Sequence, residues 1–252
     1  MKVIILDCET TGLVEPMPVE IAYFPVGENP DFHRTHLTDG WLEDITNIFN
    51  ENFEYFLQRF KPTKPIDLGA SKVNGIYMKD LLNKPCITTF KFPSETEYMI
   101  GHNIAFDHRA LGKPDVKLIC TKELAQLVIT GQKNNKLTTL VEHLYPEHSE
   151  ELLKTAHTAL QDCKLTYLVL LKCLEKLPQI ETWEQLSNLC SQGKKSYEEL
   201  DKVKPKIAIT VMPFGKHKGE LLVDVPRSYL QWMINNMDNI QPDLREAIDK
   251  LV

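Results

Sequence analysis

The chain has 252 residues, of which 42% are hydrophobic, so it is long enough for one large domain or for a domain with a small module. Its formal net charge of −6 argues against a protein that coats nucleic acid by charge alone. No apolar run approaches the roughly 20 residues of a membrane helix, and the chain starts with a strand pattern rather than a signal peptide. The six cysteines lack zinc-ligand spacing. We therefore expect a cytoplasmic protein with reduced thiols and no membrane partner.

The first predicted elements are strands. Val3–Leu6 is an unbroken apolar run rich in β-branched residues, which is typical of a strand covered on both faces. Residues 19–24 predict a second strand, and residues 53–60 fit either a third strand or a short helix. The intervening stretch 33–52 is roughly twenty residues longer than a short strand connection, so we expect a hairpin, a lid or a partner-binding insert there.

The middle of the chain alternates short strands with helices. The predicted elements are a short helix before Pro85, a strand that runs into a helix near Ala105, a strand at 117–120, helices at 121–130 and 134–146, and a long helix ended by Pro178. Early strands followed by alternating strands and helices indicate an α/β domain built on a mixed sheet.

The composition changes after the long helix. Residues 178–206 predict one helix followed by a charged linker, and residues 207–252 form a second unit with its own aromatic residues. Between residues 194 and 219 there are seven lysines and three acids, a net charge of +4 in an otherwise acidic chain. We expect the basic part of the chain to be separate from its main domain.

Four acids are candidate site residues because of their positions. Asp7 and Glu9 are two residues apart at the end of the first strand, so they project from the same face, roughly 6–7 Å apart. Asp107 falls in the predicted first turn of a helix, where an acid also complements the helix N-terminus. Asp162 shares an apolar helix face, on which an unpaired carboxylate is costly. Each acid alone also has a structural explanation.

Taken together, the four acids predict a site for divalent cations. Hard oxygen ligands suit Mg²⁺ or Mn²⁺, and two such ions about 3.5–4 Å apart can bind both the attacking and the leaving oxygen of a phosphoryl displacement. His157, just before the last acid, can accept a proton near neutral pH, although a histidine there also serves as a surface hydrogen-bonding group.

These motifs resemble a known family. "LDCETTGL" (6–13), "IGHNIAFDHRAL" (100–111) and "HTALQD" (157–162) resemble, in order and spacing, the three sequence blocks of the DEDD exonucleases in the ribonuclease H-like superfamily. His157 matches the DEDDh branch. "VNGI" (73–76) is similar to the His-Gly-Ile stretch of the family, with Asn74 where histidine is usual. The resemblance implies an α/β, ribonuclease H-like mixed sheet flanked by helices, with a small C-terminal module.

The tail of the chain adds a second resemblance. Residues 212–248 resemble the small C-terminal domain of the exodeoxyribonuclease X family, and residues 181–193 resemble the segment that precedes it. The resemblance implies a DNA-repair or end-processing enzyme that removes 5′-mononucleotides from the 3′ ends of single-stranded or duplex DNA. It further implies an exonuclease domain at 1–177, a helix and charged linker at 178–206, and a nucleic-acid-binding module at 207–252.

The same resemblance assigns roles to individual residues. It assigns metal binding to four acids and general-base catalysis to one histidine, namely Asp7, Glu9, Asp107, Asp162 and His157. It assigns the pocket of the terminal nucleotide to Thr10, Thr11, Gly12, Leu13, His102, Asn103 and Phe106. In this pocket Leu13 would act as an apolar wedge against a base. The implied cofactors are two divalent ions, Mg²⁺ or Mn²⁺.

In the C-terminal module we expect a basic turn beside a short helix. Two glycines bracket Lys216 and Lys218, so we predict that both lysines contact phosphate. Pro226 suits the start of a helix on which Tyr229 and Trp232 fall at helical spacing. We predict that Trp232 packs in the core of the module, because an aromatic residue three positions from another usually points inward.

Two other functions fit the same pattern. One is an RNA exonuclease of the same superfamily, because the chemistry depends little on the sugar beyond its 2′-OH contacts. The other is a non-enzymatic subunit, of a proofreading or adaptor kind, that binds a polymerase. Intact acids together with His157 favour an enzyme, because an adaptor has no use for buried, unpaired carboxylates.

Overall fold

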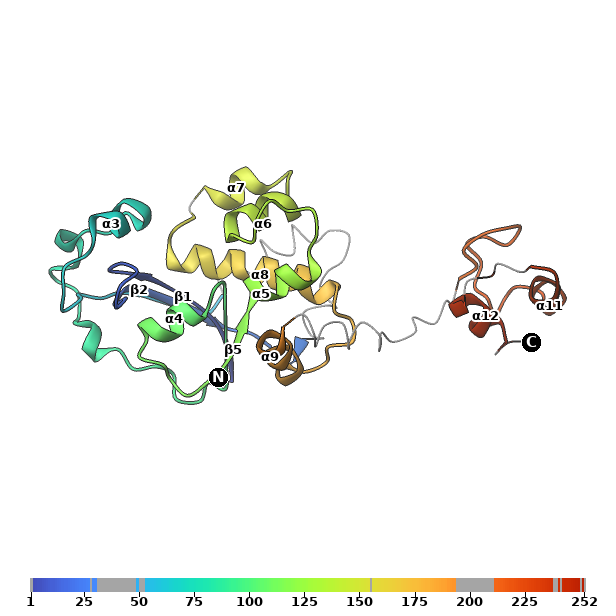
Figure 1. Cartoon of the computed structure of the whole chain (residues 1–252), viewed down its shortest axis with the longest axis horizontal. Coiled ribbons are helices and arrows are strands. Elements are labelled where there is room, and N and C mark those ends of the chain that lie inside the picture. Colours follow the sequence, from blue (N-terminus) through green and yellow to red (C-terminus); the bar gives the residue numbers. More distant parts are fainter. Residues whose placement is uncertain are drawn as a thin grey trace. The chain divides into compact units, whose positions relative to one another are not determined.

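The computed structural model describes residues 2–27, 29–30, 49, 53–154, 156–193, 211–237, 240, 242–249 and 251. The chain divides into two compact units, Met1–Lys202 and Val203–Val252 (Figure 1). The insertion expected at 33–52 lies outside the described residues except for Phe49. The charged linker expected before residue 206 also lies outside them from residue 194 onward.

A mixed five-stranded sheet forms the centre of the larger unit. Its strands are β1 (Val3–Thr10), β2 (Pro18–Pro25), β3 (Phe56–Arg59), β4 (Tyr98–Gly101) and β5 (Lys117–Cys120), in the order β3-β2-β1-β4-β5. β1 pairs antiparallel with β2 and parallel with β4, so the predicted mixed sheet is confirmed. Residues 56–59, for which the sequence left strand and helix open, form a strand.

Helices surround this sheet and build part of the smaller unit. They are α3 (Leu68–Asn74), α4 (Ala105–Ala110), α5 (Thr121–Val128), α6 (Leu137–Leu144), α7 (Ser149–Leu153), α8 (Ala159–Glu175), α9 (Trp183–Gln192), α11 (Arg227–Asn236) and α12 (Pro242–Asp249). Short 3₁₀ turns at Met78–Leu81 and Ile87–Thr89 lead from α3 towards β4. The sequence did not predict α7 and α12.

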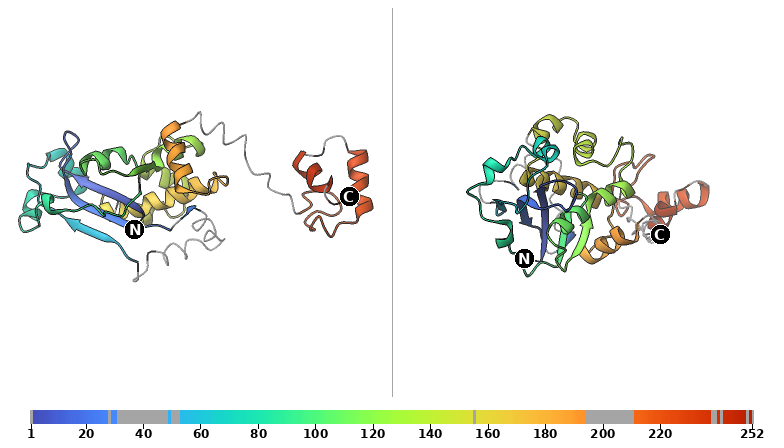
Figure 2. Two further views of the ribbon diagram at one scale, coloured as in Figure 1. Left: turned by 90° about the horizontal axis from the view of Figure 1, so that it is seen from below. Right: turned by 60° about the vertical axis from the view of Figure 1, so that its left-hand side comes forward.

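The alternation of side chains along β1 decides which residues face which layer. Val3 and Ile5 pack with α5, α6, α8 and α9 in the main core, and α8 runs along this face of the sheet (Figure 2). Ile4 and Leu6 pack in a second cluster on the opposite face. Because successive strand residues point to opposite faces, Asp7 and Glu9 continue the row of Val3 and Ile5. Both acids therefore emerge on the face covered by α8.

The long helix α8 is enclosed by protein, which accounts for its predominantly apolar sequence. Its residues from Leu165 to Leu174 are almost all buried, and α5 and α6 pack against it. Among the described residues, no helix combines the length and the apolar character needed to cross a membrane.

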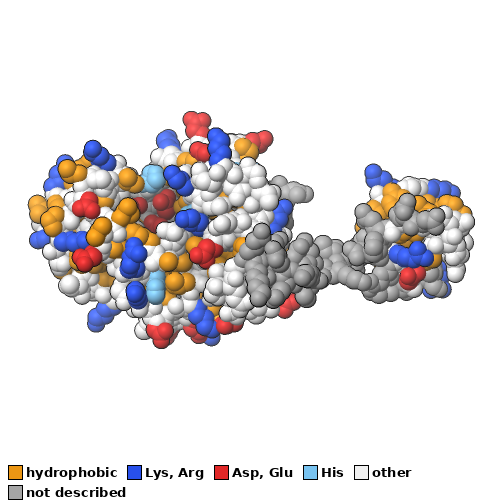
Figure 3. All heavy atoms as spheres, in the orientation of Figure 1, with side chains coloured by type: hydrophobic (Ala, Val, Ile, Leu, Met, Phe, Trp, Pro, Cys, Tyr) orange, Lys and Arg blue, Asp and Glu red, His pale blue; other side chains and the backbone are white. Residues whose placement is uncertain are grey.

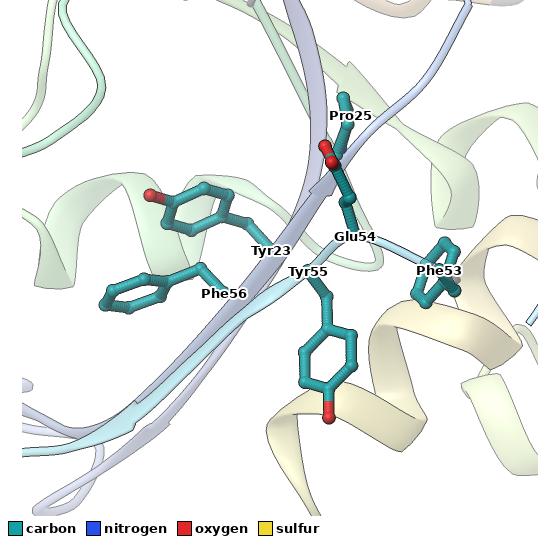
Figure 4. Close-up of a pocket in the computed structure, with 6 residues that line it drawn as sticks. All are labelled: Tyr23, Pro25, Phe53, Glu54, Tyr55 and Phe56. Carbon is teal, nitrogen blue, oxygen red and sulfur yellow. The ribbon is translucent and has the colours of Figure 1, made fainter. Parts of the chain in front are cut away.

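Aromatic rings cover the outer edge of the sheet. Tyr23 and Phe56 stack with their ring centroids 4.7 Å apart, and Phe53 and Tyr55 stack at 5.9 Å. With Pro25 and Glu54 these residues line a shallow cleft of about 410 Å³ (Figure 4). Tyr23 and Phe56 pack against the second cluster, whereas Phe53 packs against the main core, so the rings lie on both faces of the sheet at its edge strand β3.

The smaller unit has a separate core. Its core residues are Met212, Leu222, Val225, Leu230, Met233, Ile240, Leu244 and Ile248. The prediction that Trp232 packs in this core is wrong, because 52% of its surface is exposed. Leu230 and Met233 form the buried face of α11 instead, and aliphatic side chains fill the small core without the indole ring.

Candidate active site

Three acids meet where β1 approaches the first turn of α8. Asp7 and Glu9 come from the strand, and Asp162 comes from the helix. One ligand oxygen from each of the three carboxylates lies within 4.8 Å of the others. Carboxylates held this close repel one another unless protons or cations separate them. Oxygen ligands of this kind suit Mg²⁺ or Mn²⁺.

The fourth predicted acid, Asp107, is fixed beside this trio. It lies in the first turn of α4 and is buried. Its Oδ1 accepts a hydrogen bond from the backbone N–H of Cys8, with an N···O distance of 3.0 Å. Because Cys8 lies between Asp7 and Glu9 along the strand, this bond holds the carboxylate of Asp107 next to both. The structure thus brings all four predicted acids together.

Burial and mutual repulsion raise the pKa values of these acids. Burial raises the pKa of Asp7 well above its ordinary value, and the charges of Asp107 and Asp162 raise it further. Burial, followed by the charges of Asp162 and Glu20, raises the pKa of Glu9 to about 8. Burial raises the pKa of Asp107 to about 7 against the opposing effect of the Cys8 hydrogen bond. The site therefore attracts protons or cations near neutral pH.

His157 precedes α8 and is linked to the acid trio through its backbone. Its N–H donates to Asp162 Oδ1 over 3.2 Å, and its φ of +70° lies in the left-handed region. Residues other than glycine rarely adopt this conformation, so the local structure imposes it. The side chain of His157 is exposed and therefore accessible to water and substrate.

A fifth acid, Glu20, lies next to the site on β2 and was not predicted from the sequence. It is the cross-strand partner of Glu9 and is 5% exposed. Its Oε2 accepts a hydrogen bond from Arg59 Nε at 2.7 Å, and its Oε1 accepts one from the N–H of Ala159 at 3.2 Å. It therefore joins β3 to the first turn of α8. A lone acid within the apolar run 19–24 was the available signal.

A cleft of about 470 Å³ opens beside the acids. It is lined by Cys8, Glu9, Thr10, Gly12, Leu13, Val14, Asp67, Gly69, Ala70, Val73, Asn74 and Phe106. Four of the predicted pocket residues are in this lining: Thr10, Gly12, Leu13 and Phe106. Thr11 is buried, and its Oγ1 accepts a hydrogen bond from the backbone N–H of Met17.

Close contact with α3 shapes the floor of the cleft at Gly12. Its φ is +149°, and a Cβ atom at this position would lie 2.0 Å from Asp67 Oδ2. The backbone N–H of Asp67 donates to the carbonyl of Thr11 at 2.8 Å. The start of α3 therefore packs directly on this turn, and only glycine fits there.

The rim of the cleft is apolar and exposed. Leu13 is 80% exposed and Val14 is 77% exposed, and Val73 on α3 faces the same opening. The side chain of Asn74 forms a hydrogen bond with Glu9 and so opposes the rise in its pKa. Figure 3 shows acidic side chains in a hollow of the larger unit, bordered by hydrophobic and basic side chains. The apolar rim can pack against a flat apolar group, whereas the acids can bind an anion only through cations.

His102 and Asn103 do not line this cleft, and their side chains form hydrogen bonds elsewhere. The two ring nitrogens of His102 lie 2.9 Å from Thr121 Oγ1 and 2.9 Å from the carbonyl oxygen of Asn135. Burial lowers the pKa of His102 to about 4, so its ring stays neutral. Asn103 Oδ1 accepts a hydrogen bond from the amine of Lys122. His102 thus links the end of β4 to the start of α5 and to the loop before α6. Nucleotide binding by His102 or by Asn103 stays a prediction.

Comparison with known proteins agrees with this geometry. The chain is 26% identical to exodeoxyribonuclease 10 of Escherichia coli (strain K12) over 189 residues, which span 73% of this chain and 79% of the relative. A solved structure of exonuclease X with 5′-overhanging duplex DNA is 23% identical, has a TM-score of 0.53, and is matched over 75% of this chain and 99% of that chain. The zinc-bound complex of E. coli exonuclease I with single-stranded DNA is 16% identical, with a TM-score of 0.50 over 70% of this chain and 41% of that chain.

The sheet order and the flanking helices define a ribonuclease H-like fold, as the sequence predicted. Within this fold, the chain resembles exodeoxyribonuclease 10 and exonuclease X, so the predicted resemblance to exodeoxyribonuclease X is confirmed.

Two further comparisons match only short parts of the chain. Residues 201–237 match a family model described as "Putative quorum-sensing-regulated virulence factor". A stretch of 27 residues, 11% of this chain, is 59% identical to the uncharacterized protein YpeB of E. coli (strain K12) and covers 38% of that protein. The predicted resemblance of the tail to exodeoxyribonuclease X stays a prediction.

Proposed function

We propose that the protein is a metal-dependent 3′-to-5′ exonuclease that hydrolyses DNA to 5′-mononucleotides. One observation carries the proposal: the carboxylates of Asp7, Glu9 and Asp162 converge within 4.8 Å beside a cleft with an apolar rim. The preference for DNA is supported by the relatives, which are named as an exodeoxyribonuclease and as exonucleases bound to duplex or single-stranded DNA.

Two divalent ions, Mg²⁺ or Mn²⁺, fit the donor set. Asp7, Glu9 and Asp162 would hold them, with Asp107 as the fourth carboxylate. Bound ions would supply charge to offset the negative charge on the attacking and leaving oxygens. The raised pKa values support this assignment, since buried acids without a counter-charge otherwise retain protons.

In one hydrolytic step, the residues of the chain then have separate roles. A water oxygen attacks the phosphorus of the terminal phosphodiester, and His157 accepts the proton of that water. The bond between phosphorus and the 3′-oxygen of the preceding nucleotide breaks, and that oxygen takes a proton from solvent. The phosphate stays on the released nucleotide as its 5′-phosphate. The hydrogen bond from the His157 N–H to Asp162 positions the base beside the acids.

The cleft selects a strand end. Thr10, Gly12 and Phe106 line the space for the terminal nucleotide, and Leu13 is placed to act as a wedge against its base. A pocket closed by α3 and the turn at Gly12 accepts a chain terminus more readily than the middle of a strand. We assign the exonuclease domain to 1–177, the helix and linker to 178–206, and a nucleic-acid-binding module to 207–252. A role in DNA repair and a cytoplasmic location stay predictions.

One assay tests the proposal. Oligonucleotides labelled at the 5′ or the 3′ end are supplied as single-stranded DNA, duplex DNA with a 5′ overhang, and single-stranded RNA, each with Mg²⁺ or with chelator. We expect the 3′ label to appear first as a mononucleotide and the 5′-labelled strand to shorten stepwise, in Mg²⁺ only. Asp7→Asn serves as the inactive control. Internal cuts, activity in chelator, or faster digestion of RNA than of DNA would contradict the proposal.

A further inference from the structure

The smaller unit displays an exposed indole, Trp232, beside the partly buried ring of Tyr229, which packs against the core of the unit. Trp232 is 52% exposed, and its ring stacks on that of Tyr229 with centroids 5.9 Å apart and planes at 30°. The ring of His217 meets Tyr229 edge-on at 4.6 Å. His217, Tyr229 and Trp232 thus form a continuous row of rings, which we call the ring row. A large exposed indole on a small unit with a complete aliphatic core suggests a binding surface.

A rigid basic turn lies against the ring row. The turn is closed by hydrogen bonds from the N–H of Met212 to the carbonyl of Glu220 at 2.8 Å and from the N–H of Gly219 to the carbonyl of Met212 at 2.9 Å. Lys216 and Lys218 project from it and are exposed. The acid of the same turn, Glu220, lies 2.9 Å from His217 Nδ1, so its charge is directed towards that ring.

Gly215 explains how the turn and the rings form one surface. Its φ is +79°, and a Cβ atom there would lie 2.9 Å from the hydroxyl oxygen of Tyr229. The lack of a side chain lets the backbone of the turn approach the ring of Tyr229. The lysines and the ring row are therefore neighbours. Figure 3 shows hydrophobic and basic side chains together on the smaller unit.

Charge and shape together identify the occupant. Lys216 and Lys218 place two positive charges beside the rings, and the acid of the turn, Glu220, is directed towards His217. Exposed aromatic rings beside lysines match single-stranded nucleic acid, whose bases stack on the rings while its phosphates meet the amines. In a duplex the bases already stack on one another and cannot use the rings. An acidic peptide would use the lysines but would leave the flat faces of the rings unused.

We propose that the smaller unit carries a second binding site for single-stranded DNA, separate from the acidic cleft, in which unpaired bases stack on Trp232 and Tyr229 while Lys216 and Lys218 contact the backbone phosphates. The choice of DNA over RNA rests on the proposed function. The site holds unpaired strand and does no chemistry, because the described part of the unit contains no cluster of acids comparable to that of the larger unit.

The test measures binding by the full chain in chelator, which prevents digestion. A fluorescent thymidine oligonucleotide of about 30 nucleotides and a blunt duplex are titrated by anisotropy at several salt concentrations. We expect Trp232→Ala to weaken single-strand binding about tenfold, with little change for the duplex. The double variant Lys216→Ala/Lys218→Ala should flatten the slope of log affinity against log salt by roughly 0.7 per lost phosphate contact, whereas Trp232→Ala should leave the slope unchanged.

Controls separate the site from folding and from catalysis. Gln231→Ala changes an exposed residue of the same helix and should bind as the parent does. The chain has three tryptophans, Trp41, Trp183 and Trp232, so the part of the emission quenching by unlabelled oligonucleotide that is lost in Trp232→Phe reports stacking on this indole. Digestion of very short oligonucleotides in Mg²⁺ should be the same in the parent and in Gln231→Ala.

The two proposals fail in different ways. Equal single-strand affinity for the parent and Trp232→Ala, together with unquenched emission, would overturn the ring-row site even if the nuclease assay succeeds. Absence of any nuclease activity in the parent would overturn the proposed function while the binding titrations still report on the ring row. Tighter binding of RNA than of DNA would overturn the choice of ligand.

Discussion

Glu20 and Arg59 form an ion pair across β2 and β3, with 2.7 Å between Arg59 Nε and Glu20 Oε2. The second oxygen of Glu20 accepts the N–H of Ala159, the first residue of α8. Through this carboxylate, the edge of the sheet determines where the helix that carries Asp162 begins. The charge of Glu20 also raises the pKa of Glu9. Arg59 compensates this charge, so the pair both positions the site and limits its repulsion.

We expect Glu20→Ala to lower kcat about tenfold or more and the free energy of unfolding by about 1–3 kcal/mol, because a buried N–H loses its acceptor and Arg59 loses its partner. Glu20→Gln keeps an acceptor for Ala159 and should recover part of kcat. A purely structural role predicts that stability falls while kcat per folded molecule stays constant. Steady-state kinetics together with chemical denaturation distinguish the two.

The matched control is Glu175→Gln, which removes the ion pair between Lys172 and Glu175 at the far end of the same helix. This pair is partly exposed, so its loss should change stability by less than about 1 kcal/mol and leave kcat unchanged. An equal effect of Glu175→Gln and Glu20→Gln on kcat would show that the position of α8 near the acids does not depend on Glu20.

A second prediction separates the ring of His157 from its backbone. His157→Gly removes the imidazole but keeps the N–H that donates to Asp162, and glycine adopts a φ of +70° without strain. We expect a loss of turnover of about 10²–10⁴-fold, while binding of Mn²⁺ and DNA is retained. A general base makes turnover depend on pH, so the pH–rate profile should change in this variant. Single-turnover assays across pH measure both effects.

The control for this variant is His157→Asn, because asparagine also tolerates the left-handed conformation but is not a base. Both variants should be equally slow. If His157→Asn retains nearly full activity, the ring is a structural group and another acceptor takes the proton.

Much of this site was predictable because its signals are local. Asp7 and Glu9 share a face by the two-residue period of a strand, and the apolar face of α8 indicated where Asp162 points. Glu20 escaped prediction because its partners, Arg59 and Ala159, lie 39 and 139 residues away. The motif around His102 predicted that this residue lines the pocket. Its hydrogen bonds to Thr121 and Asn135 depend on tertiary structure, so the sequence did not indicate them.

The error at Trp232 has a different physical cause. Helical spacing tells which residues share a face, but it does not tell how much core there is to fill. In the smaller unit, Leu230, Met233 and residues from α12 already close the interior, so the largest ring stays outside. The short helix predicted before Pro85 is a 3₁₀ turn at Met78–Leu81, and α3 precedes it where the sequence predicted a loop. Such short pieces lack a period that the sequence can display.

A third prediction concerns the floor of the cleft. Gly12→Ala would place a methyl group 2.0 Å from Asp67 Oδ2, so the side chain of Asp67, or α3 with it, must shift away from the turn. We expect KM for single-stranded DNA to rise more than kcat falls, because the acids stay in place while the pocket widens. Removal of the obstructing carboxylate in Gly12→Ala/Asp67→Ala should lower KM again. A double variant as impaired as Gly12→Ala would assign the defect to backbone strain at residue 12 rather than to the contact with Asp67.

The last prediction concerns the stability of the metal-free protein. The folded state raises the pKa of Asp7, and it raises that of Glu9 from 4.5 to about 8, so folded protein binds more protons than unfolded protein in this range. Stability should therefore fall as pH rises from about 4.5 to about 8, because removing these protons costs more free energy in the folded protein than in the unfolded protein. Asp7→Asn removes one charge from the cluster and should relieve part of this loss.

Melting temperatures in chelator at pH 5 and pH 8 measure the effect as the difference between the parent and Asp7→Asn. We expect the variant to be the more stable protein at pH 8 and the difference to shrink at pH 5, where the parent carboxyls are protonated. Addition of Mn²⁺ at pH 8 should stabilise the parent more than the variant, since the ions bind the folded carboxylates. Glu175→Gln, which lies outside the cluster, should follow the parent at both pH values. A pH-independent difference, or equal stabilisation by Mn²⁺ in parent and variant, would show that repulsion among these acids is not the cause.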